Sequence, residues 1–169
     1  MNVDQFWQII EESRSDFSAT APDGNMDRQI TRLTELLSAL PPQDVVDFDR
    51  HFSVHFIEAY IWDLWAAAYI IEGGCSDDGF MDFRSWLISM GRTVFAESLR
   101  DVESLVKYAS DPTVEACSFE EFQYVAGKVY GRQIDHDIEY PSEPSGKKWD
   151  EDSDDLEKRF PRLWERFGE

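Results

Sequence analysis

Apolar residues recur three and four positions apart along most of the chain, in segments separated by glycine and proline. This spacing places them on one face of a helix. No segment shows the strict alternation of a half-buried strand bounded by turns. The pattern therefore predicts an all-α protein, a single helical domain over residues 1–169 built as a bundle of about six to seven helices with a long central helix.

The N-terminal half is predicted to form the centre of this bundle. Helices are expected at about residues 3–18 and 25–40, and a third helix is expected to run from about 42 to 72. The second half of the third helix is apolar nearly all round. A helix of that kind needs neighbours on several sides, so it is predicted to be the long central one.

Glycines and capping residues indicate where the following helices begin and end. The Gly73–Gly74 pair suits a left-handed turn that ends the third helix, and Ser76 is placed to cap a fourth. Helical spacing continues at about 94–105. The segment 118–121 has the Ser-x-x-Glu order of a capping box and predicts a helix at about 119–130.

The end of the chain combines an acidic segment with apolar residues. Residues 135–158 contain ten acids against three lysines, and prolines interrupt any helical pattern. An acidic loop is therefore expected at about 134–153, either as a solvated segment or as a partner-binding arm. Apolar residues at helical spacing then predict a C-terminal helix at 154–167, which docks back on the bundle.

The charge balance limits the kinds of partner. The chain has 35 Asp and Glu against 16 Lys and Arg, a formal net charge of −19. Such a surface repels phosphate backbones and anionic lipid heads, so neither nucleic acid nor a membrane is expected as a direct partner. A basic protein partner fits this charge, although acidity also serves solubility alone.

Several features predict a cytoplasmic protein. Cys75 and Cys117 lie 42 positions apart, without the spacing of a metal-binding pair, and both are expected to be reduced. The N-terminus has acids where a signal peptide has bases. The longest nearly uncharged run, residues 59–71, has 13 residues and is too short to cross a bilayer.

Asp63 is the sole charged residue in that apolar run. An unpaired buried carboxylate would be costly, so Asp63 is expected to pair with Arg84 or Arg92 of the next helix, unless it faces solvent. The pair would either fix the helix register or form the acid and anion-binding group of a pocket. The apolar walls of that pocket would be three tryptophans, Trp62, Trp65 and Trp86.

The turn after the apolar run offers two other kinds of site. Asp77 and Asp78 suggest a cation site, but the alternating acids and the final Glu of a calcium loop are missing. Cys75 lies near the start of a helix, whose dipole lowers a thiol pKa, while the adjacent acids oppose that effect. Ending one helix and capping another explains these residues without either role.

Asp47, His51 and His55 lie four positions apart along the third helix. Two histidines at this spacing can share a metal ion, with the carboxylate as a third ligand. The zinc-protease pattern needs Glu directly after the first histidine, and Phe52 stands there. A polar edge on an amphipathic helix is the commoner reason for such a pattern, so no metal and no cofactor are assigned.

A long string of residues has the character of a family signature. Its segments are Phe48-Asp49, 62–69 (WDLWAAAY), 73–80 (GGCSDDGF), 83–89 (FRSWLIS), Gly91-Arg92 and, near the end, 161–164 (PRLW). They are similar to those of DUF4240, a bacterial family of unknown function. The resemblance implies a small cytoplasmic bacterial protein, and it carries no established activity and no catalytic residue.

Two functions follow from these observations. The first is a non-catalytic protein-binding or regulatory module that engages a basic protein, as an adaptor or as toxin-neutralising immunity proteins do. The net charge and the lack of a nucleotide loop or hydrolase motif favour it. The alternative is an enzyme or small-ligand binder around Asp63 with Arg84 or Arg92. The sequence leaves the oligomeric state open.

Overall fold

Helices make up the regular structure of residues 1–152 and 154–169, the part of the chain that the computed structural model describes. The helices are α1 (Val3–Ser13), α2 (Asn25–Ser38), α3 (Pro42–Glu58), α4 (Trp62–Glu72), α5 (Asp77–Ser89), α6 (Arg92–Arg100), α7 (Leu105–Ala109), α8 (Val125–Tyr130), α9 (Asp155–Arg159) and α10 (Pro161–Phe167), with the 3₁₀ turns η1 (Val102–Ser104) and η2 (Glu120–Tyr124). The predicted all-α class is confirmed. Ten α-helices in the described part replace the six to seven expected, because several predicted helices are broken.

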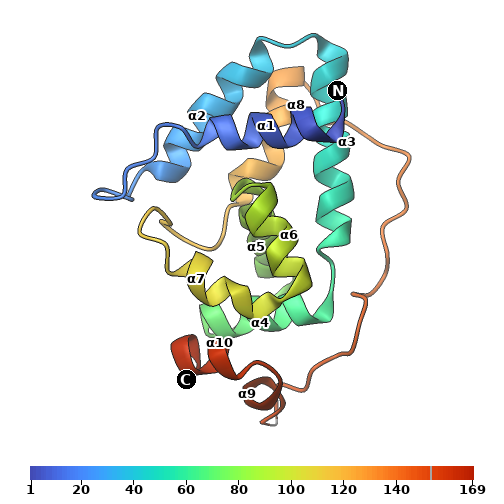
Figure 1. Cartoon of the computed structure of the whole chain (residues 1–169). Coiled ribbons are helices and arrows are strands. Elements are labelled where there is room, and N and C mark those ends of the chain that lie inside the picture. The colour runs from blue at the N-terminus through green and yellow to red at the C-terminus, as the bar shows by residue number, and fades with distance from the viewer. Residues whose placement is uncertain (153) are drawn as a thin grey trace.

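The helices surround one apolar core. α1 and α2 lie across one end of the molecule beside α3 and α8, α5 and α6 occupy the centre, and α4 crosses the other end next to α9 and α10 (Figure 1). One fully buried residue from each of five helices illustrates the continuity of the core: Phe6, Leu33, Leu64, Phe83 and Leu163. No helix in the described part has the length and apolar character needed to cross a membrane.

The long central helix predicted for residues 42–72 is wrong, because two helices stand in its place. α3 ends at Glu58, and residues 59–61 turn the chain before α4 begins. Ser145, far along the chain, supplies the hydrogen bonds at this break. Its N–H donates to the Tyr60 carbonyl at 3.0 Å, and its carbonyl accepts from the Trp62 N–H at 2.9 Å. A tertiary contact therefore overrides the local helical pattern.

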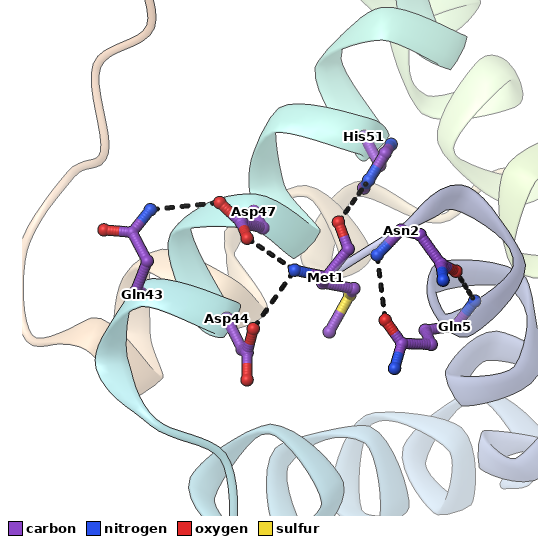
Figure 2. Close-up of polar contacts among 7 residues, drawn as sticks. All are labelled: Met1, Asn2, Gln5, Gln43, Asp44, Asp47 and His51. Atoms are coloured by element: carbon purple, nitrogen blue, oxygen red, sulfur yellow. Dashed lines mark hydrogen bonds and ion pairs between the residues drawn. The ribbon is translucent and has the colours of Figure 1, made fainter.

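Local signals set other helix ends as predicted. Gly73 has φ +69° and ends α4 in the left-handed conformation. The Ser76 hydroxyl accepts from the Gly79 N–H at 3.1 Å and caps α5. At α1, Asn2 and Gln5 form a reciprocal capping box, each side-chain oxygen accepting from the other residue's N–H at 2.9 Å (Figure 2).

Two predicted helices differ from expectation. The capping box expected at residues 118–121 does not form, because the 3₁₀ turn η2 follows Phe119 and α8 begins only at Val125. The predicted C-terminal helix at 154–167 is interrupted after α9. Pro161 has no N–H to continue the helical pattern, and it suits the first turn of the new helix α10.

The segment between α8 and α9 is fastened to the bundle. We call residues 131–149 the strap; it runs along the outside of α3 towards α9 (Figure 1). His136 donates to Asp49 of α3 at 2.7 Å, Ser145 pairs with the backbone at the α3–α4 break, and Trp149 packs against aromatic rings of α4. The strap is thus fastened at three points: to α3, to the α3–α4 break and to α4.

Candidate functional site

Asp63 is half exposed and lies in the first turn of α4, where the helix dipole favours a carboxylate. Its Oδ1 accepts from Arg159 Nη2 of α9 at 2.8 Å. The predicted pairing with Arg84 or Arg92 is therefore wrong. The other side of α4 carries the apolar run into the core, so the lone charge of that run marks its exposed edge.

Arg84 of α5 is buried, and its side chain lies against the C-terminus of α3. Its Nη1 donates to the Phe56 carbonyl at 2.8 Å, and its guanidinium lies over three rings, those of Phe56, Tyr60 and Phe80, at 3.9, 4.6 and 4.8 Å from their centroids. No carboxylate in the described residues forms an ion pair with it, and burial lowers its pKa to about 10. Arg84 thus places a positive charge at the negative end of α3.

The other predicted members of the Asp63 pocket are scattered. Arg92 donates to Asp4 at 2.6 Å on an exposed surface, and Trp86 is buried in the core beside Phe83. Trp62 and Trp65 stack on each other with ring centroids 5.4 Å apart, next to Trp149 of the strap. Of the residues predicted for the Asp63 pocket, Trp62 and Trp65 remain beside Asp63, and the Trp65 Nε1–H donates to the Cys75 carbonyl at 3.0 Å.

The turn at residues 73–79 serves the ends of α4 and α5. Burial and the neighbouring Glu72 carboxylate raise the pKa of the Cys75 thiol to about 12. The thiolate is the nucleophilic form of cysteine, so these surroundings oppose the predicted reactive thiol. Asp77 and Asp78 lie in the first turn of α5, and no cluster of three or more metal-binding side chains occurs in the described residues.

Glu72, at the end of α4, is expected to make the free energy of unfolding depend on pH. Burial raises the pKa of Glu72 from 4.5 to about 7, with the Asp82 charge adding to the rise. Between these values the folded state holds a proton that the unfolded state has lost, so stability falls as pH rises through the window. We expect Glu72→Gln to flatten this fall. Because the side chain is also open to solvent, the effect is expected to stay below about 1 kcal/mol.

Urea unfolding of wild type and Glu72→Gln between about pH 4 and 8 measures this difference. Glu121→Gln, which removes an exposed carboxylate of η2, is the matched control for a simple change of net charge. Equal pH slopes for wild type and Glu72→Gln would contradict the assignment.

Asp47 and His51 bind the first residue of the chain (Figure 2). The Met1 amino group donates to Asp47 Oδ2 at 2.6 Å and to Asp44 Oδ1 at 3.2 Å. His51 Nε2 lies 3.2 Å from the Met1 carbonyl oxygen. These hydrogen bonds raise the pKa of the amino group and lower that of Asp47.

His55, the third member of the predicted metal set, belongs to an aromatic cluster. Its ring centroid lies 4.8 Å from that of Trp7, and its Nδ1 is 3.0 Å from Glu58 Oε2. Asp47, His51 and His55 therefore make separate structural contacts rather than a common metal site.

A groove of about 790 Å³ lies between α3, α5, η2, α8 and the strap. This volume is within the range of small-ligand pockets. One face of α3 forms its wall, with Asp49, Phe52, Ser53 and Phe56 at the spacing of successive helical turns. Tyr140 of the strap also lines the groove.

The α3 wall combines a carboxylate, a hydroxyl and two aromatic rings. Asp49 accepts from His136 at Oδ2, and burial raises its pKa while that hydrogen bond lowers it. Ser53, one helical turn further on, is 8% exposed, and its hydroxyl has no hydrogen bond among the described residues. Phe52 and Phe56 lie on the same wall with ring centroids 5.7 Å apart.

Exposed apolar side chains gather at the rim of this groove. The described residues include four large apolar side chains that are exposed, and three of them line it: Met81 at 38%, Tyr124 at 48% and Tyr140 at 56%. Single exposed apolar residues are ordinary, but a group of them beside a hollow is typical of a binding surface.

Acidic side chains lie near Tyr124, at one end of the groove. Burial and the charges of Glu120, Asp82 and Asp78 raise the pKa of Tyr124, which indicates a negative potential at this end. The strap adds further acids on both sides of His136. Two exposed cations, Lys128 and Arg132, line the groove at its α8 end.

The residues of this groove were not among the predicted site residues. A signal was present, because Asp49 and Ser53 are polar positions four apart beside the apolar stripe of α3. The partner of Asp49 was out of reach of sequence reasoning. His136 lies 87 positions away in a segment without helical periodicity.

The residues that match a known protein family include every wall of the groove except most of the strap. The family described as "Protein of unknown function (DUF4240)" matches residues 1–132. The chain belongs to the DUF4240 family. The DUF4240 match includes α3, α5, η2 and α8 and ends at the beginning of the strap, so the resemblance at 161–164 lies outside it. Searches of the curated proteins and of the solved structures found no match.

Proposed function

We propose that this DUF4240 protein is a non-catalytic binding module of the cytoplasm that recognises a basic segment of a partner protein. The observation that carries the proposal is the groove beside α3, where exposed apolar side chains lie at the rim and the Asp49 carboxylate lies on the wall. Apolar contacts supply affinity in such a surface, and the charges supply attraction and selectivity. The net charge of −19 extends this attraction beyond the groove.

The contacts in the groove favour binding over catalysis. Asp49, Ser53 and His136 are the residue types of a nucleophilic triad, but the described hydrogen bonds include none between Ser53 and His136. Activation of a serine needs that contact. The alternative site around Asp63 has no supporting cluster, because Arg84 and Arg92 bind elsewhere.

The proposal predicts salt-dependent capture of basic proteins. Immobilised protein is expected to retain a basic set from a native lysate at about 0.05 M salt and to release it near 0.5 M, because screening shortens the reach of surface charges. Mass spectrometry identifies the set.

The double variant Met81→Ser with Tyr124→Ser keeps the charge and removes apolar rim contacts. It is expected to weaken capture about tenfold, or roughly 1.4 kcal/mol. Capture that ignores ionic strength, or a retained set that this variant leaves unchanged, would contradict the proposal.

A further inference from the structure

We infer that the groove receives one lysine or arginine side chain of the partner segment, with its charged end at Asp49 and Ser53. This inference rests on the proposed function and names the chemical group that the groove selects. The receptor is built by α3, because residues four apart on a helix lie on the same face. Both side chains line the groove.

Asp49 and Ser53 have the acceptors that a cation needs. His136 occupies Asp49 Oδ2, whereas no hydrogen bond among the described residues involves Asp49 Oδ1. The Ser53 hydroxyl also makes no hydrogen bond there, and its oxygen is accessible from the groove. An ammonium or guanidinium group carries several donors and no acceptor, so it satisfies both oxygens together.

The same wall suits the stem of a long basic side chain. Phe52 and Phe56 are each 8% exposed, and their rings flank the polar pair on α3. Lysine and arginine cover apolar surface with their methylene groups. The Arg84 guanidinium already lies over the Phe56 ring, so Phe56 offers the stem apolar surface only. Met81 and Tyr124 extend this apolar surface to the rim for the neighbouring residues of the segment.

At the α3 wall the charge that favours a cation is that of Asp49, the acidic side chain that lines the groove in the described residues. Asp78, Asp82 and Glu120 lie at the Tyr124 end, and the strap contributes more acids. Lys128 and Arg132 oppose a cation from the α8 end, where both are exposed. The inference therefore predicts the sign of a substitution: removing the Lys128 charge strengthens binding of a basic group, whereas it would weaken binding of an anion.

The test uses acetylated and amidated pentapeptides, Ala-Leu-X-Phe-Ala, in which X is lysine, arginine or norleucine. Norleucine keeps the apolar stem and lacks the charge. Titration of the ¹⁵N-labelled full chain is expected to shift amide signals at residues 49–56 with the lysine and arginine peptides. The norleucine peptide is expected to bind about tenfold more weakly.

Variants then locate the charged end. With the lysine peptide, Asp49→Asn is expected to weaken binding about tenfold and Ser53→Ala about threefold, while Lys128→Gln strengthens it about twofold. Asp78→Asn is the matched control, because it makes the same charge change at the rim; it is expected to alter binding less than twofold. Ser53→Ala leaves the His136–Asp49 contact in place, so it tests the receptor even if Asp49→Asn loosens the strap.

Each of the other possible outcomes would overturn one part of this inference. Equal binding of the lysine and norleucine peptides, or weaker binding with Lys128→Gln, would overturn recognition of a cation. Equal losses for Asp49→Asn and Asp78→Asn, or shifts away from α3, would overturn the receptor while the salt-dependent capture of basic proteins stands. No shift with any peptide at about 5 mM would overturn the inference whatever the capture experiment shows. Failure of capture itself would overturn the proposed function.

Discussion

Replacing Arg84 with alanine is expected to lower the free energy of unfolding by about 3 kcal/mol, because three losses coincide in the core. The Phe56 carbonyl loses its donor at the end of α3, and its burial makes an unmet acceptor costly. The rings of Phe56, Tyr60 and Phe80 lose the cation that lies over them. The truncated side chain also leaves a cavity beside α5. Urea unfolding followed by tryptophan fluorescence measures the change.

Two variants separate these contributions. Arg84→Met fills most of the volume but has no donor and no charge, so it is expected to cost about 1–2 kcal/mol. Arg84→Lys keeps a charge near the negative end of α3 and should be less damaging than alanine. An Arg84→Met protein as stable as wild type would show that the carbonyl and the charge are unimportant. Only packing would then remain as the role of this residue.

Arg159→Ala is expected to cost about 2 kcal/mol and to free the end of the strap. Arg159 donates to Asp63 Oδ1 at 2.8 Å, and it also donates to two strap carbonyls, those of Lys147 and Lys148, at 3.0 and 3.3 Å. One side chain thus joins α9, α4 and the strap, and only 19% of it is exposed. Faster amide exchange at residues 145–149 is expected alongside the loss of stability.

Asp63→Ala is the matched comparison for this contact. It removes only the ion pair, and half of the Asp63 side chain is exposed, so a cost of about 0.5 kcal/mol is expected. Equal costs for Asp63→Ala and Arg159→Ala would mean that the ion pair, rather than the two carbonyl contacts, holds this region.

Helix ends determined by neighbouring residues were predictable from the sequence, whereas ends determined by distant residues were not. Gly73 and Ser76 act within a few positions, and their residue types alone indicate the turn. The break between α3 and α4 depends on Ser145 and on Arg84, whose effects on residues 59–61 arise only after the chain has folded. The apolar pattern across this break is continuous, so it predicted one helix.

The same distinction separates the two candidate sites. Asp63 drew attention as a lone charge in an apolar run, but the pattern did not reveal that its side chain is half exposed or that its partner Arg159 lies 96 positions away. The groove depends on Asp49, Ser53 and a strap whose sequence has no regular period. Polar residues beside an apolar stripe are common on helices, so their grouping around a hollow required the structure.

The position of the strap in the chain has a consequence for biosynthesis. The helical walls of the groove come from α3, α5, η2 and α8, and the strap that borders them is made afterwards. A nascent chain that ends before residue 131 therefore displays the apolar face of α3 with neither Tyr140 nor the acids of the strap. Arg159 and Trp149 secure the strap still later. On the proposed function, charge-selective recognition would be one of the last properties the growing polypeptide acquires, and its early surface is the kind that general chaperones bind.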